Sequence, residues 1–167
     1  KGDRVICTGY RVGEAWWGGY ATHASLKSGW LVKAPDGLSD IQAMAIGTAG
    51  FTAMQCVLAL EKQGITPASG EVLVTGAGGG VGSVAVALLG KLGYTVTAGS
   101  GRAELADYFT DLGASSMIGR KELTELAKRP LQSERFAGAV DAVGGDLLAG
   151  VLTAMKYKGV VAACGLA

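Results

Sequence analysis

This sequence of 167 residues has few cysteines, little net charge and no long uninterrupted apolar run. Its three cysteines, Cys7, Cys56 and Cys164, are odd in number and far apart, which argues against a disulfide framework and favours a reducing, cytoplasmic setting. A net charge of +1 gives no electrostatic reason to expect nucleic acid or an anionic membrane as a partner. No signal peptide is visible, and no apolar run approaches the roughly 20 residues that span a bilayer.

Metal ligands are equally scarce. A structural zinc site needs four soft ligands, whereas the chain offers three scattered cysteines and one histidine, His23. His23 falls in a β-like run and is better explained as a partly buried strand residue, and the cysteines as small buried apolar residues. We therefore expect no metal.

What the sequence has in abundance is apolar residues and glycine. Hydrophobic residues make up 49% and charged residues 17%, which predicts a compact globular chain with room for a substantial core. The 28 glycines lack the three-residue repeat of collagen and stand at turns. They lie between the predicted secondary structure elements.

The first part of the chain alternates short β-like runs with glycine turns. The runs are Arg4–Thr8, Tyr20–Ser25 and Trp30–Lys33, and no helical periodicity appears before Asp40. This pattern is typical of the end of an all-β domain.

A helix is expected over residues 40–63. Ser39 or Asp40 is a plausible N-cap, Gly64 suits the C-terminal cap, and glycines within residues 47–50 break the helix into two segments.

From Glu71 onward, strand and helix patterns alternate, which predicts an α/β fold with a doubly wound parallel sheet covered by helices on both faces. Right-handed crossovers give the strand order 3-2-1-4-5, and a ligand is expected at the carboxyl ends of the first and fourth strands, where the winding reverses. The predicted strands are Val72–Thr75, Thr95–Ala98, Ser116–Ile118, Ala139–Ala142 and Gly159–Ala163, and the predicted helices are Gly80–Leu92, Arg102–Leu112, Glu122–Lys128 and Asp146–Met155.

The turn after the first of these strands has the composition of a phosphate-binding loop. The spacing Ala77-x-Gly79-x-x-Gly82 matches the dinucleotide fingerprint, with alanine in the first glycine position. Glycine lets the backbone approach a diphosphate closely, and the helix N-terminus that follows offers unpaired N–H groups with partial positive charge. A plain glycine-rich turn is the alternative, and the flanking strand and helix favour the cofactor loop.

The end of the second strand indicates which dinucleotide binds. An NAD site places an acidic residue there, whereas this chain has Ser100, Gly101 and Arg102 and no carboxylate before Glu104. A hydroxyl and a guanidinium suit the 2′-phosphate of NADP, and Arg120 could add a second positive contact. The alternative makes Ser100 a helix cap and Arg102 a solvated residue of the next helix.

Taken together, these motifs resemble the medium-chain dehydrogenase/reductase superfamily, and within it the group of NADPH-dependent acrylyl-CoA reductases and quinone oxidoreductases. The resemblance covers the whole chain. Its specific parts are Gly47–Met54, within the motif Ala45–Met54, and Ser100–Arg102. The other segments that carry it are Lys1–Val5, Trp17–Ala21, Gly29–Val32, Thr75–Ser83 and Ala163–Ala167.

The resemblance implies two domains. Residues 1–38 would end a GroES-like catalytic domain, and residues 39–167 would form most of a Rossmann domain whose sixth strand follows this segment. It also implies a cofactor site: Gly79, Gly80, Val81 and Gly82 at the diphosphate, Ser100, Gly101, Arg102 and Arg120 at the adenosine phosphate, and Thr52 and Leu166 on the nicotinamide side. A helix threonine bonded to its own backbone is the alternative for Thr52.

By the same resemblance the protein is a zinc-independent oxidoreductase that reduces the activated C=C bond of an enoyl thioester such as acrylyl-CoA with NADPH. Quinone or enone reduction, and a non-catalytic nucleotide-sensing protein on the same fold, are the alternatives. The groups that polarise and protonate the substrate would lie largely before this segment, so we name no catalytic residue and expect the segment alone to be inactive. The intact protein is expected to act on a small molecule, as a cytoplasmic homodimer.

Overall fold

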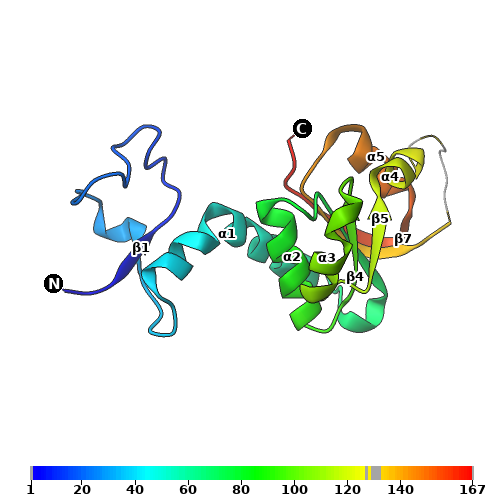
Figure 1. Ribbon diagram of the computed structural model, residues 1–167, viewed down its shortest axis with the longest axis horizontal. Coiled ribbons are helices and arrows are strands. Elements are labelled where there is room, and N and C mark those ends of the chain that lie inside the picture. The colour runs from blue at the N-terminus through cyan, green and yellow to red at the C-terminus, as the bar shows by residue number, and fades with distance from the viewer. Residues whose placement is uncertain (1, 127, 129–132, 167) are drawn as a thin grey trace. The chain divides into compact units, whose positions relative to one another are not determined.

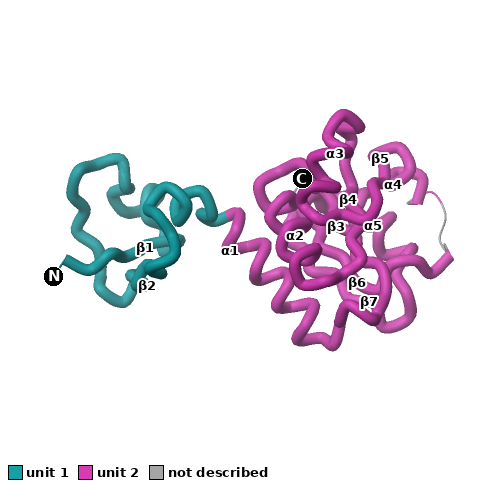
Figure 2. The backbone as a smooth tube through the Cα atoms, turned by 60° about the horizontal axis from the view of Figure 1, so that its bottom comes forward, with its two compact units in different colours: residues 1–48 teal, residues 49–167 magenta. Residues whose placement is uncertain are grey.

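The chain forms two compact units, residues 1–48 and 49–167 (Figure 2). The computed structural model describes residues 2–126, 128 and 133–166. The boundary between the units falls within one helix, ten residues after the domain boundary predicted between residues 38 and 39. That predicted domain boundary stays a prediction.

Unit 1 contains a small antiparallel pair of strands, β1 (Val5–Cys7) and β2 (Leu31–Lys33). A 3₁₀ turn, η1 (Ser28–Trp30), directly precedes β2. The strand predicted over Tyr20–Ser25 was wrong, because this run is exposed and irregular. A β-like sequence forms a ladder only beside a partner strand. His23 accordingly is exposed and lies outside any strand, contrary to the prediction.

Helix α1 (Asp40–Lys62) begins and ends as its sequence predicts. The Ser39 hydroxyl accepts the Gln42 N–H at 3.2 Å, while the Ser39 N–H donates to the Gln42 side chain at 2.9 Å, which forms a capping box. Gly47 has φ +47° and ψ −154°, a conformation that favours glycine and breaks the helix. At the other end Gly64 takes φ +88° as the C-terminal cap.

By length and composition alone, α1 is apolar enough to cross a membrane. The break at Gly47 interrupts it, and Ala53, Val57 and Leu60 of its second half are completely buried in the core of unit 2. Core packing therefore explains the buried face of this half, whereas Phe51, Met54 and Leu58 on it are exposed.

Unit 2 is a five-stranded sheet in the order β5-β4-β3-β6-β7, with every neighbouring pair parallel. In chain order this is 3-2-1-4-5, which confirms the predicted doubly wound topology. Figure 2 labels all five strands, and Figure 1 shows β4, β5 and β7 as arrows. The central strand, β3, lies between the second and fourth strands of the series, so the winding reverses beside it. The strands are β3 (Glu71–Thr75), β4 (Thr95–Ser100), β5 (Ser116–Gly119), β6 (Phe136–Asp141) and β7 (Met155–Ala163).

Helices connect these strands near the predicted positions. The fifth strand begins four residues earlier than predicted, at Met155, because α5 ends at Thr153. The helix predicted over Glu122–Lys128 begins two residues earlier, at Arg120. Residue 127 lies outside the described residues, and Lys128 is in a turn. The elements are η2 (Pro67–Ser69), α2 (Gly80–Lys91), η3 (Ala103–Leu105), α3 (Ala106–Asp111), α4 (Arg120–Leu126) and α5 (Gly145–Thr153).

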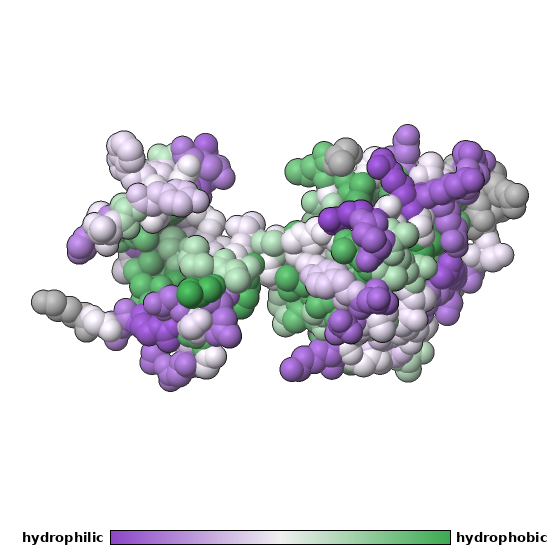
Figure 3. Space-filling model, in the orientation of Figure 1, coloured by the Kyte–Doolittle hydropathy of each residue, from purple (hydrophilic) through white to green (hydrophobic). Residues whose placement is uncertain are grey.

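The two faces of the sheet carry separate cores. On one face, strand residues such as Val74 and Val96 pack against α1, α2 and α3, with Leu60 and Phe109 among the buried side chains. On the other face Leu73 packs with residues of α4 and α5. The face of the molecule shown in Figure 3 mixes apolar with polar residues.

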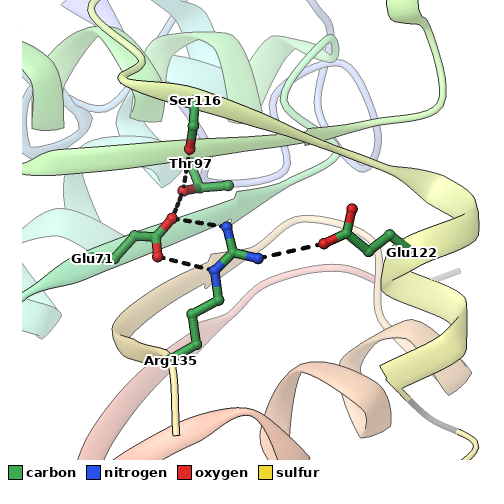
Figure 4. A network of polar contacts seen from close by, with 5 residues as sticks. All are labelled: Glu71, Thr97, Ser116, Glu122 and Arg135. Carbon is green, nitrogen blue, oxygen red and sulfur yellow. Dashed lines mark hydrogen bonds and ion pairs between the residues drawn. The ribbon is translucent and has the colours of Figure 1, made fainter. Parts of the chain in front are cut away.

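A polar network holds the amino ends of the strands together (Figure 4). Glu71, the first residue of β3, accepts two guanidinium hydrogen bonds from Arg135, at 3.0 and 3.1 Å, and one from the Thr97 hydroxyl. Ser116 contacts Thr97 at 2.8 Å, and Glu122 of α4 lies 3.5 Å from Arg135. Burial raises the pKa of Glu71, but the hydrogen bonds from Arg135 and Thr97 and the Arg135 charge outweigh it, so the pKa lies below its usual value.

Glu71→Gln is expected to lower stability in a pH-dependent way. Because the folded-state pKa of Glu71 is depressed, the carboxylate stabilises the fold fully above its unfolded-state pKa, and this contribution is lost as pH falls through the folded-state pKa. We expect the variant to lose about 1 kcal/mol at neutral pH, since both partners are partly exposed. Urea unfolding at several pH values measures this difference.

Glu122→Gln is the matched control, because this carboxylate is 62% exposed and contacts the same arginine at 3.5 Å. Its loss should cost less than about 0.5 kcal/mol. A Glu71→Gln effect that stays constant from neutral to acidic pH would contradict this explanation.

Candidate functional site

The turn after β3 brings a helix N-terminus close to the carboxyl edge of the sheet. Gly76 has φ +61°, the Gly79 N–H donates to the Gly76 carbonyl at 2.9 Å, and Gly79 is the N-cap of α2. The Ala77 N–H donates to the Gly99 carbonyl of β4 at 3.0 Å, which attaches the turn to the neighbouring strand. This local structure is the predicted strand, glycine turn and helix.

Glycine is required at Gly82 because the helix passes directly over the turn. A Cβ there would overlap the Gly76 carbonyl oxygen and the Ala77 backbone. At Gly80 a Cβ would lie 3.1 Å from the Ala49 side chain of α1. The predicted diphosphate residues Gly79–Gly82, with partly buried Val81 among them, therefore form the first turn of α2 and its cap. Their N–H groups and the helix dipole suit an anion.

Arg102 links this turn to the end of β4. Its guanidinium Nη2 donates to the Gly78 carbonyl oxygen at 2.5 Å, although Arg102 is exposed. A Cβ at Gly78 would collide with the guanidinium, so the glycine leaves room for the arginine. Ser100 is buried at the end of β4, and its hydroxyl accepts the Arg102 N–H at 3.1 Å. The hydroxyl thus fixes the backbone from which the arginine side chain extends.

Arg120 comes from a third element, the first residue of α4, and packs beside Gly101. A Cβ at Gly101 would lie 3.5 Å from the Cβ of Arg120, an ordinary contact distance. The structure therefore places the two predicted phosphate-binding arginines next to the same short segment, Ser100–Arg102.

The two residues predicted on the nicotinamide side lie on other elements. Thr52 is partly buried on α1, one turn after Ala49, which packs beside the first residue of α2. Residues three apart share a helix face, so Thr52 lies on the face of α1 next to the glycine turn. Leu166 is exposed at the end of the described chain, and the preceding Gly165 packs on the backbone of Val143.

A buried polar pair joins the ends of β3 and β6 and was not predicted from the sequence. Thr75, the last residue of β3, is paired in register with Asp141, the last residue of β6, and both are fully buried. The Thr75 hydroxyl donates to Asp141 Oδ1 at 2.5 Å and accepts the Ala142 N–H at 3.1 Å. The sequence does contain one sign of this pair. Asp141 directly follows the apolar residues of β6, and a buried charged residue needs a hydrogen-bonding partner.

The cysteines only partly match the expectation of buried apolar residues. Cys56 is buried, whereas Cys7 and Cys164 are partly exposed, and all three are free thiols. Burial, together with the neighbouring Cys164 thiol, raises the pKa of Cys56 to about 11, which makes it a poor nucleophile. Within the described residues, no group of three or more His, Cys, Asp or Glu side chains could hold a metal ion.

A doubly wound parallel sheet, a glycine turn after its central strand and a helix N-terminus at its carboxyl edge define a Rossmann-type nucleotide-binding domain. No protein-family model matches the chain. Curated relatives do: it is 61% identical over 166 residues to the acrylyl-CoA reductase AcuI of Ruegeria pomeroyi and 56% identical to a protein of Escherichia coli with the same name.

Solved structures agree with these relatives. A Salmonella enterica yhdH oxidoreductase in complex with NADP is 57% identical, with a TM-score of 0.93 over 98% of this chain. The yhfP protein of Bacillus subtilis, solved with NAD bound, is 47% identical with the same TM-score and coverage, and its curated name is quinone oxidoreductase. The chain spans about half the length of these relatives, 50% of AcuI and of both solved chains. The predicted resemblance to the medium-chain dehydrogenase/reductase superfamily is therefore confirmed over nearly the whole chain.

Gly82→Ala is expected to destabilise unit 2, because its Cβ would overlap the turn after β3. Overpacking of this kind costs about 1–3 kcal/mol of unfolding free energy. Gly119→Ala in β5 is the matched control, since a Cβ there meets nothing within 4 Å and should change stability by less than about 0.5 kcal/mol. Equal urea midpoints for the two variants would show that the close approach is not required.

Proposed function

We propose that this chain binds NADPH at the carboxyl edge of its sheet. The observation that carries the proposal is Arg102, which reaches from the end of β4 to the glycine turn, with Arg120 beside the same segment. The first turn of α2 suits the diphosphate, and the two arginines suit the 2′-phosphate that distinguishes NADP from NAD. The NADP-bound relative at 57% identity supports this assignment.

The residues fit such a cofactor in a second respect. Gly79 and Gly80, the cap and first residue of α2, are exposed and carry no side chain, so the backbone there can approach a ligand closely. No acidic residue stands between the end of β4 and Glu104, so the 2′-phosphate meets no early like charge. Of the nicotinamide-side predictions, Thr52 is favourably placed on the face of α1 next to the glycine turn, and Leu166 stays a proposal.

For the whole protein we propose reduction of the activated C=C bond of an enoyl thioester such as acrylyl-CoA. Bound NADPH supplies the hydride, and this chain's residues hold the dinucleotide and shield it from water. The names of the relatives at 61% and 56% identity support this substrate class. We assign no catalytic acid to residues 1–167.

Quinone or enone reduction is the second candidate, because the relative at 47% identity is named as a quinone oxidoreductase. The same residues would bind the cofactor in either reaction. We further propose that residues 1–38 belong to a GroES-like catalytic domain and that the protein works in the cytoplasm. We also propose that the intact protein is a homodimer, as the resemblance implies.

Arg102→Gln should weaken NADPH binding selectively. Loss of charge-assisted hydrogen bonds to a phosphate corresponds to about a tenfold or greater rise in the dissociation constant. NADH, which lacks the 2′-phosphate, should change by less than about threefold. Isothermal titration of the protein from its complete gene measures both.

Lys121→Gln is the matched control, because this exposed cation follows Arg120 and tests general charge effects. It should leave the ratio of NADPH to NADH affinity unchanged. An equal loss of affinity for both cofactors in Arg102→Gln would contradict the role given to Arg102.

The substrate class is tested by NADPH oxidation at 340 nm with acrylyl-CoA and with a soluble benzoquinone, assayed in parallel. We expect kcat/KM for acrylyl-CoA to exceed that for the quinone by at least about a hundredfold, because a specific site binds the transition state of its own substrate. A higher value for the quinone would favour the second candidate. No oxidation with either would reject both.

A further inference from the structure

The carboxyl ends of three neighbouring strands meet at two residues, Thr75 and Asp141. The parallel ladder between β3 and β6 ends at this pair, and beyond it the chain turns away from the sheet on both strands. The Thr75 hydroxyl bonds both to the Asp141 carboxylate and to the Ala142 N–H. These two hydrogen bonds connect the turn after β3 to the turn after β6.

The same aspartate residue also holds the end of β7. Its backbone carbonyl accepts the N–H groups of Cys164 and Gly165 at 2.9 and 3.0 Å, and the Cys164 thiol lies 3.4 Å away. Gly76, which follows Thr75, lies so close to Val143 that a Cβ would approach the Val143 side chain to 3.1 Å. The turns after β3, β6 and β7 therefore pack against one another.

The pair is costly for folding. Asp141 is fully buried, and its second oxygen, Oδ2, has no hydrogen-bond partner among the described residues. A buried carboxylate with one unpaired oxygen opposes folding, and two apolar side chains of similar size could join the strands without this cost. A group retained at such a position points to a role other than stability.

We propose that Thr75 and Asp141 are positioning residues for the dinucleotide. Thr75 sets the position of Gly76, whose carbonyl receives the Gly79 N–H and lies under Gly82, so it sets where the first turn of α2 begins. The Asp141 carboxylate accepts the Thr75 hydroxyl, and the backbone carbonyl of the same residue holds the segment that leads to Leu166. The pair thus couples the diphosphate end of the site to its nicotinamide end. This inference rests on the proposed function.

Thr75→Val, which keeps the shape and removes the hydroxyl, tests the proposal in the protein from its complete gene. We expect the KM and dissociation constant for NADPH to rise about tenfold, because small displacements of a binding turn are costly, while kcat changes little. Thr75→Ser keeps the hydroxyl and should bind NADPH like the unmutated protein, even though it loses a buried methyl group.

Thr97→Val is the matched control. Thr97 is equally buried, and its hydroxyl also donates to a carboxylate. That carboxylate belongs to Glu71, in the network at the amino ends of the strands. It should lower the melting temperature without changing the KM for NADPH. A role in folding alone predicts instead that affinity follows the melting temperature across all three variants, and that outcome would overturn the proposal.

If Thr75→Val does not fold, Asp141→Asn replaces it. The amide oxygen still accepts the Thr75 hydroxyl, but the bond loses its charge assistance, so the KM for NADPH should rise at least about threefold. An unchanged KM would overturn the proposal. Absence of NADPH binding by the unmutated protein would instead refute the proposed function, so the two failures are distinguishable.

Discussion

The structure of unit 2 depends on the close approach of α2 to the turn after β3. Gly82 rests on the carbonyl of Gly76 with no space for a side chain, and this contact sets the height of the helix above the sheet. Because α2 starts there, its unpaired N–H groups face the carboxyl edge beside the central strand. Arg102 reaches the same turn only because residue 78 is glycine.

The two edges of the sheet differ in how their polar groups are satisfied. At the amino edge Glu71 is surrounded by donors from Arg135 and Thr97, and the network adds stability. At the carboxyl edge Asp141 keeps an unpaired buried oxygen. Polar groups that lower stability are found at sites where a fold positions a ligand. Fully hydrogen-bonded networks are found where polar groups only stabilise the fold. This difference supports the site that we propose at the carboxyl edge.

The topology was predictable because it follows from local patterns. Alternating strands and helices fix the order 3-2-1-4-5 once crossovers are right-handed, and the glycine spacing identifies the turn. The strand expected at Tyr20–Ser25 was wrong because a ladder depends on a partner, which a single segment does not reveal. The bond between Thr75 and Asp141 joins residues 66 apart, so it depends on strand register. The contact of Arg102 with Gly78 depends likewise on the fold.

We propose that the site at the carboxyl edge binds a dinucleotide with a 2′-phosphate. Calorimetric titration of the unmutated protein with NADPH and with NADH, at several salt concentrations, tests this proposal most directly. NADPH should bind at least about tenfold more tightly at low salt, and the difference between the two affinities should narrow as salt screens the arginine charges. Equal affinities at every salt concentration would contradict it.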